Sequence, residues 1–248
     1  MVLTIMKREW LRLKPSMFSL LMFAIIFTLT LFLVIGFPFY SVIQTEQGMK
    51  FMYWVAPGIW IFMSSFIAYF ISLDGINSLL VEKRPIEAIC SMPISNKFIL
   101  IGILNLAIII GIFQWIISFL FTALLNNEIY TSTQLLRLFI QSLPSILFFG
   151  GLGIMVALIT SNKFSQLTVS GLVFTVLGFG MGCFIPIKYF PEEIKSILEI
   201  IPITNLISGA HNITFQNPGS FTGGLFSALL GIVFILISFG LSNKRFRR

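Results

Sequence analysis

The chain has 248 residues, of which 57% are apolar and only 10% are charged. Soluble domains carry roughly 25% charged residues, and a chain with so few cannot cover its surface with groups that water solvates. The composition therefore excludes an ordinary soluble enzyme. The apolar excess also excludes a disordered chain. We expect an integral membrane protein whose solvent is the bilayer.

Six apolar stretches are long enough to cross the hydrocarbon core as helices, which takes about 20 residues each. None of them shows the alternation expected of a membrane β-strand, so the predicted fold is all-α. They leave no room for a separate soluble domain, and residues 1–248 are predicted to form a single transmembrane domain. The six stretches are residues 17–37, 53–73, 98–125, 135–160, 167–185 and 221–241.

The basic residues predict the orientation of these spans. With the N-terminus in the cytoplasm, 12 of the 16 Lys and Arg residues fall on the inner side and 4 on the outer side, as the positive-inside rule expects. Six spans then return the C-terminus to the cytoplasm. The net charge of +7 faces the anionic inner leaflet, and it gives no reason to expect a nucleic-acid partner.

The first 15 residues are expected to form an amphipathic helix on the cytoplasmic leaflet. Leu3, Met6, Trp10 and Leu13 fall on one helical face, and Pro15 ends the run. The basic residues Lys7, Arg8 and Lys14 are expected to point away from this face. The alternative is a frayed basic leader that only orients the first span.

Residues for chemistry within the membrane are scarce. No carboxylate lies in the middle of a predicted span, although proton relays and ion-coupled sites usually need one. His211 is the only histidine and Asp74 the only aspartate, so we expect neither a metal site nor a catalytic site. The sequence also lacks a G-x-x-x-x-G-K-[ST] phosphate loop, so energy for any driven process must come from another subunit.

Three amides lie within the predicted spans, at Asn105, Gln114 and Gln141. They allow two interpretations, either a neutral binding site or hydrogen bonds between helices.

Two segments outside the spans are longer than a simple connection requires. Residues 74–97 carry a charged centre at Glu82, Lys83 and Arg84 and suit docking to a cytoplasmic partner, or alternatively lie on the lipid surface. Residues 186–220 are divided by prolines and contain apolar stretches too short to cross. We expect short re-entrant helices here, between spans five and six.

These segments carry a resemblance to a known family. Tyr53-x-x-x-Pro57-Gly58 begins the second span, and Glu82-Lys83-Arg84-x-x-Glu87-Ala88 precedes Met92-Pro93-Ile94-Ser95. Pro186-Ile187-x-x-Phe190-Pro191 and Ile201-Pro202-Ile203-Thr204-Asn205 follow the fifth span. In this order the motifs resemble the membrane subunit of a type-2 ABC exporter. His211 and Asn212 stand where many relatives carry an arginine.

The resemblance implies a permease that moves a drug, lipid-linked glycan, lipid or peptide outwards across the cytoplasmic membrane of a prokaryotic cell. It implies a second permease copy, as a homodimer or a heterodimer, within the membrane lipids. It also implies two cytoplasmic ATP-binding subunits that bind ATP and Mg, so this chain needs no cofactor of its own. The alternatives are a membrane anchor for an ATPase, and an ATP-independent channel or secondary carrier.

The resemblance also assigns roles to residues. The coupling segment would contain Glu82, Lys83, Arg84, Glu87, Met92 and Pro93. The interface helix would use Lys7, Arg8, Trp10 and Arg12, and the outer gate would use Pro186, Pro191, Pro202 and Asn205.

Aromatic residues are the remaining candidates for lining a transport pathway, because their faces suit sugars and lipid-like drugs. They are equally normal at lipid-facing and interfacial positions. The candidate pathway residues are Tyr53, Trp54, Pro57, Trp60, Phe66, Tyr69, Phe113 and Trp115.

Overall fold

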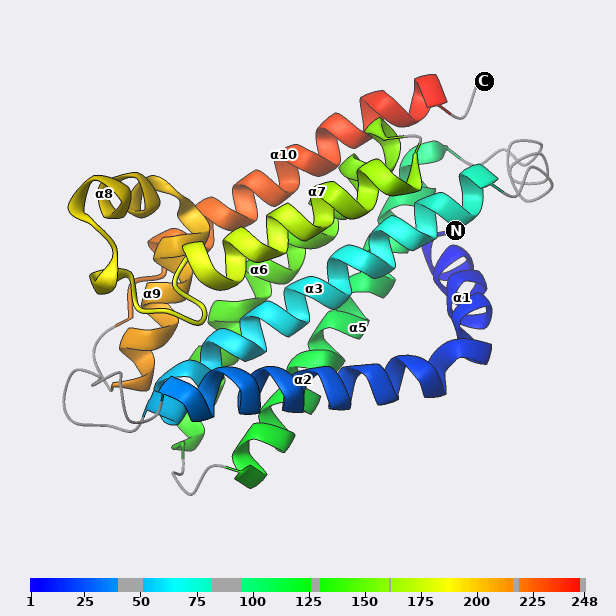
Figure 1. The fold of residues 1–248 in the computed structure, drawn as a ribbon. Coiled ribbons are helices and arrows are strands. Elements are labelled where there is room, and N and C mark those ends of the chain that lie inside the picture. The colour runs from blue at the N-terminus through cyan, green and yellow to red at the C-terminus, as the bar shows by residue number, and fades with distance from the viewer. Residues whose placement is uncertain (40–50, 82–94, 126–129, 161, 216–218, 246–248) are drawn as a thin grey trace.

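The computed structural model describes residues 1–39, 51–81, 95–125, 130–160, 162–215 and 219–245. Every regular element within these ranges is a helix (Figure 1). The predicted coupling residues Glu82, Lys83, Arg84, Glu87, Met92 and Pro93 lie outside the described residues. Their role therefore stays a prediction.

Five helices of the described chain are long and apolar enough to cross a membrane, judged by length and composition. They correspond to predicted spans one, two, three, four and six. A helix of 30 residues measures about 45 Å, which exceeds the hydrocarbon core. The five are α2 (Met17–Phe39), α3 (Phe51–Val81), α5 (Asn96–Leu125), α6 (Ser132–Ile159) and α10 (Thr222–Arg245).

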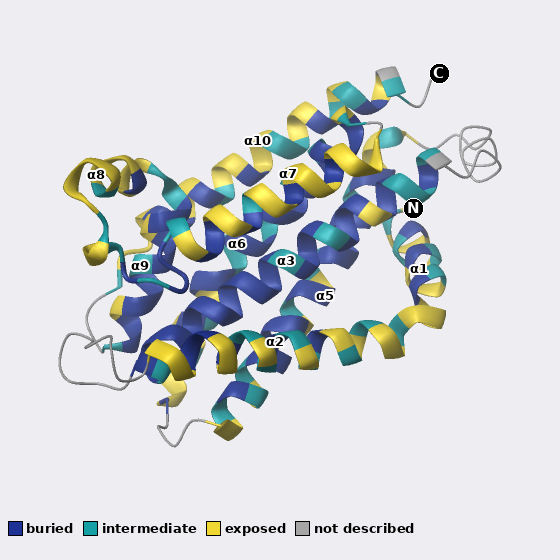
Figure 2. Ribbon diagram, viewed as in Figure 1, coloured by how far each residue is buried: buried dark blue, intermediate teal, exposed yellow. Residues whose placement is uncertain are grey.

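Helix α3 is the centre of the bundle, and α5 and α6 make the most extensive contacts with it. Its side chains are buried over nearly the whole length, whereas α2 and α10 expose one face (Figure 2). Close approach depends on small residues, as is usual between membrane helices. A Cβ atom on Gly153 of α6 would lie 2.4 Å from the carbonyl oxygen of Tyr69 in α3. Only glycine fits at this crossing.

The predicted fifth span has a different structure from the other five. It consists of α7 (Lys163–Thr175), which continues into a π-helical turn, η3 (Val176–Gly180). The chain then bends through residues 181–185, where Gly182 has a φ of 90°, a conformation that favours glycine. Helix α7 itself has 13 residues and is not among the five long helices. The six-span topology therefore stays a prediction.

The N-terminal helix is present as α1 (Val2–Leu13), followed by a short 3-10 helix, η1 (Lys14–Ser16). Pro15 lies in η1, where the path turns sharply into α2 (Figure 1). Helix α1 buries Ile5, Glu9 and Leu13, whereas Leu3 and Trp10 of the predicted leaflet-facing side are exposed. The cause is packing against α5: a Cβ atom on Gly102 would lie 2.7 Å from Cγ2 of Ile5.

The predicted outer segment forms three short helices, η4 (Ile187–Tyr189), α8 (Glu192–Ile200) and α9 (Pro202–Thr214). Helix α9 packs against α10, α6 and α3, while α8 is largely exposed (Figure 2). Both lie at the end of the bundle opposite α1 and the C-terminal end of α10 (Figure 1). Neither is long enough to cross a bilayer, and their entry into the membrane stays a prediction.

Candidate functional site

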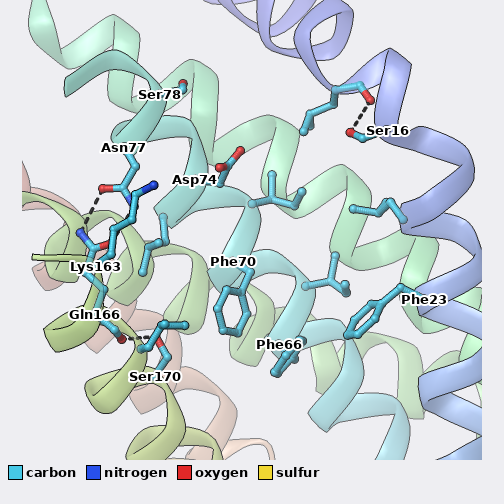
Figure 3. A pocket seen from close by; sticks show the side chains of 16 residues that line it. Ser16, Phe23, Phe66, Phe70, Asp74, Asn77, Ser78, Lys163, Gln166 and Ser170 are labelled. Atoms are coloured by element: carbon cyan, nitrogen blue, oxygen red, sulfur yellow. Dashed lines mark hydrogen bonds between the residues drawn. The ribbon is translucent and has the colours of Figure 1, made fainter. Parts of the chain in front are cut away.

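A pocket of about 730 Å³ opens between α2, α3 and α7, at the half of the bundle that carries α1 (Figure 3). Its volume lies in the range of small-molecule sites, about 300–1,000 Å³. The lining residues are Leu13, Ser16, Leu20, Phe23, Phe66, Ile67, Phe70, Ile71, Leu73, Asp74, Asn77, Ser78, Lys163, Gln166, Leu167 and Ser170.

Aromatic rings form one part of the pocket wall. The ring centroids of Phe23 and Phe66 are 6.0 Å apart, and those of Phe66 and Phe70 are 4.5 Å apart. Behind them, Phe174 of α7 lies 5.0 Å from Phe66. These rings come from three helices, so the wall exists only when α2, α3 and α7 assemble.

Hydrogen-bonding groups form another part of the wall and join α3 to α7. The amides of Asn77 and Gln166 pair reciprocally: Nδ2 of Asn77 donates to Oε1 of Gln166 at 2.8 Å, and Nε2 of Gln166 donates to Oδ1 of Asn77 at 3.0 Å (Figure 3). About two helical turns along α3 from Asn77, the hydroxyl of Tyr69 lies 2.9 Å from that of Ser170 in α7. Polar contacts of this kind hold helices together where lipid supplies no hydrophobic drive.

An ionic cluster beside the pocket joins α1 to α3. Arg12 donates from Nε to Oε2 of Glu9 at 2.8 Å and from Nη1 to Oδ2 of Asp74 at 2.6 Å. The Glu9 side chain is 1% exposed, so its charge depends on these partners. Arg8 completes the cluster, with Nη1 lying 3.7 Å from Oε1 of Glu9. The cluster thereby fixes α1 to the end of α3 that precedes the predicted coupling segment.

At the opposite end, the start of α3 packs against α9. The rings of Trp54 and His211 stack with centroids 3.9 Å apart, and Nε2 of His211 lies 3.1 Å from the carbonyl oxygen of Gly182. Burial lowers the pKa of His211 to about 4, although the carbonyls of Gly182 and Trp54 act in the opposite direction. The imidazole is therefore neutral at physiological pH.

Gln141 joins α6 to the same outer region by hydrogen bonds. Its Nε2 donates to the carbonyl oxygens of Leu206 at 3.0 Å and Ser220 at 3.3 Å. Gln114 of α5 likewise donates to Oγ1 of Thr28 in α2 at 3.1 Å. The interpretation of these two glutamines as bridges within the bundle is therefore confirmed.

The candidate pathway aromatics do not surround the pocket. Of that set only Phe66 lines it. Tyr53 stacks on Tyr130 with centroids 4.4 Å apart, and the indole nitrogen of Trp60 donates to Thr122 at 2.7 Å. Six of the candidate pathway residues are instead buried within the bundle, namely Tyr53, Trp54, Pro57, Trp60, Tyr69 and Trp115.

The outer-gate prolines delimit the short helices. Pro186 precedes η4, Pro191 caps α8, and Pro202 is the first residue of α9. Asn205 donates from Nδ2 to the carbonyl oxygen of Glu199 at 2.8 Å, which braces the junction of α8 and α9. A gating role for these residues stays a prediction.

Sequence reasoning missed the pocket residues Phe23, Asn77, Gln166 and Ser170. The available signal was the presence of two amides near the predicted inner ends of spans two and five. Their pairing depends on residues 89 positions apart and on the crossing of α3 with α7.

The family model for the ABC-2 type transporter matches residues 1–215, which contain the pocket, the ionic cluster and all of α9. The chain belongs to this family. Comparison with curated proteins found no significant match.

Membership makes this chain a multi-pass membrane permease of an ABC transporter. The family domain is the transmembrane subunit and not the ATP-binding cassette, and such a permease works with an ATP-binding subunit.

Proposed function

We propose that this permease is the transmembrane subunit of an ATP-driven exporter and that the pocket between α2, α3 and α7 admits the substrate. The pocket supports this proposal because its lining combines an aromatic wall with polar groups, including Ser16 and Lys163. Such a lining suits an amphipathic substrate taken from the cytoplasm or the inner leaflet and released outside.

The assembly that we propose contains two permease copies, identical or related, and two cytoplasmic ATP-binding subunits in a prokaryotic cytoplasmic membrane. ATP and Mg would bind to the partner subunits. Residues 82–93 and α1 would receive their movement.

The contacts around the pocket suggest how movement reaches the substrate. Helix α3 runs without interruption from Trp54 at α9 to Val81, directly before the predicted coupling residues 82–93. A displacement of its inner end would carry Asp74 and Asn77 together, and so act on both α1 and α7. Closure of the ATP-binding subunits would then alter the pocket through a shift between two conformations.

The test is purification of the tagged permease from its native membrane, followed by an ATPase assay with a panel of amphipathic dyes. An exporter predicts a co-purified ATP-binding subunit, ATPase activity that rises with a transported dye, and ATP-dependent dye uptake into inside-out vesicles. A complex whose ATPase never drives uptake would instead indicate an anchor. Dye flux without an ATP-binding partner would indicate a channel or carrier.

A further inference from the structure

A second cavity, of about 280 Å³, lies between α1, α2 and α5, away from the substrate pocket. Its wall is almost wholly apolar. The one amide in it, Gln114, donates to Thr28 and Ser118. The residues that line it are Trp10, Met17, Leu20, Leu21, Ala24, Ile109, Ile110, Phe113, Gln114 and Ile117.

We call this cavity the groove, since its lining residues extend along α5. Its α5 wall runs from Ile109 to Ile117, which corresponds to about 12 Å of helix. Trp10, which is 42% exposed, lies at the α1 end. Tryptophan is enriched where headgroups meet hydrocarbon, so a groove with Trp10 at one end suits an extended hydrocarbon chain whose polar end is beside Trp10.

The cations of α1 and η1 fall into two groups, those that form ion pairs and those that do not. Arg8 and Arg12 are neutralised by Glu9 and Asp74. Lys7 and Lys14 are exposed and form no ion pair within the described part of the chain. They stand three residues before and four residues after Trp10, which makes both of them its neighbours on the helix surface.

We propose that this groove binds one acyl chain of an anionic phospholipid of the inner leaflet, with the phosphate held by Lys7 and Lys14. The two free lysines supply the charge complementarity, and the groove supplies van der Waals contact for the chain. This site is separate from the proposed transport role, because it can be measured without any ATP-binding subunit.

The first experiment is native mass spectrometry of the delipidated full-length permease, titrated with phosphatidylglycerol or phosphatidylcholine of identical chains. The parent should bind phosphatidylglycerol more tightly. K7Q/K14Q should weaken phosphatidylglycerol binding about 30-fold, to the level of phosphatidylcholine. The control K97Q/R137Q removes two other exposed cations, neither of which lines a pocket described above, and should leave the preference intact. Equal binding of the two lipids by the parent, or equal loss in the control, would overturn the headgroup assignment.

The second experiment fills the groove. Leu21 lines it and is 37% exposed, whereas Ile26 of the same helix is 59% exposed and lies outside the lining. L21W should lower the affinity for both lipids on the order of tenfold, and I26W should not. No difference between these variants would contradict the groove as the binding site.

A fluorescence measurement keeps the proposal testable if a groove variant fails to fold. Trp54, Trp60 and Trp115 are each at most 6% exposed, which leaves Trp10 as the accessible tryptophan. Phosphatidylglycerol brominated on its chain should quench the parent more than W10F. Equal quenching of both proteins would refute the placement of the chain beside Trp10.

Discussion

Glu9 shows how one buried charge constrains the N-terminal helix. Its carboxylate is buried, and Arg12 is its close ionic partner. A buried acid left without a partner destabilises a fold strongly, whereas an exposed pair contributes little. The same arginine reaches Asp74, whose side chain is 57% exposed. The Glu9 contact therefore matters for stability, and the Asp74 contact for the connection to α3.

We expect R12A to lower the free energy of unfolding by about 2–3 kcal/mol, because Glu9 would face only Arg8 at a longer distance. D74N should lower it by less than about 1 kcal/mol. Thermal unfolding in detergent measures both, with K163A as the control for loss of an exposed cation. Equal melting temperatures for R12A and K163A would contradict the role of Glu9.

His211 predicts a pH dependence with a definite sign. Its pKa is lowered from 6.5 to about 4 in the folded protein, so the unfolded chain binds the proton more readily. Above pH 6.5 the imidazole is mostly neutral in both the folded and the unfolded chain, so its burial costs no protonation free energy there. The permease should lose up to about 3 kcal/mol of stability as the pH falls from 6.5 to 4.

The pH profile of thermal unfolding checks this expectation. H211F keeps a ring to stack on Trp54 but cannot titrate, so its profile should lack the loss between pH 6.5 and 4. Superimposable profiles of the parent and H211F would show that His211 is not responsible.

At the scale of elements, two glycines provide a matched test of helix packing. A Cβ atom at Gly153 would lie 2.4 Å from a backbone oxygen of α3, whereas one at Gly171 would meet nothing within 4 Å. G153A should destabilise the bundle by about 2 kcal/mol or more. G171A should be neutral or stabilise by up to about 1 kcal/mol, since alanine favours helix. The melting temperature should therefore fall clearly below that of the parent for G153A, and should stay equal or rise for G171A.

Helices α3 and α7 are joined by the Asn77–Gln166 amide pair and by the packing of Phe174 on Phe66, so a cross-link at the amide pair tests whether the two helices move apart. In a background lacking Cys90 and Cys183, N77C/Q166C should be joined by a short bifunctional thiosulfonate reagent. Because movement of α7 relative to α3 would be blocked, ATP-driven uptake should fall at least tenfold and recover on reduction.

The control for this cross-link is N77C/T168C. Thr168 is exposed on α7 and should not join to position 77. Uptake that persists in the cross-linked N77C/Q166C complex would show that the amide pair does not separate during transport.

At the scale of the whole molecule, α3 contacts α1 and α7 near one of its ends, through Asp74 and Asn77, and α9 near the other, through Trp54. Helices α1 and α9 lie at opposite ends of the bundle (Figure 1). Helix α3 joins these ends. The proposed energy input and the proposed outer cap are therefore connected through one continuous helix.

Charge reversal at the coupling segment tests the proposed assembly. E82K/R84E should release the ATP-binding subunit or abolish dye stimulation of its ATPase. The melting temperature of the permease alone should stay within a few degrees of the parent, since surface substitutions rarely exceed about 0.5 kcal/mol. A stable complex with unchanged dye stimulation would remove these residues from the coupling site.

The amino-acid sequence alone determined the helical membrane class, five long helices and the short helices between α7 and α10. The reason is that a bilayer forces each spanning segment to satisfy its backbone hydrogen bonds internally, so apolar length suffices to predict a helix. Proline positions also indicated where η4, α8 and α9 begin. The family resemblance likewise depended on local motifs, and the family match confirmed it.

Only the tertiary structure decided which faces meet. Most spans are apolar all round, so hydrophobic periodicity does not separate a protein-facing side from a lipid-facing side. The pairing of Arg12 with Asp74 joins residues 62 positions apart, and that of Asn77 with Gln166 joins residues 89 positions apart. The pocket, the lipid groove and the buried face of α1 all arise from such helix crossings, which depend on packing between distant segments.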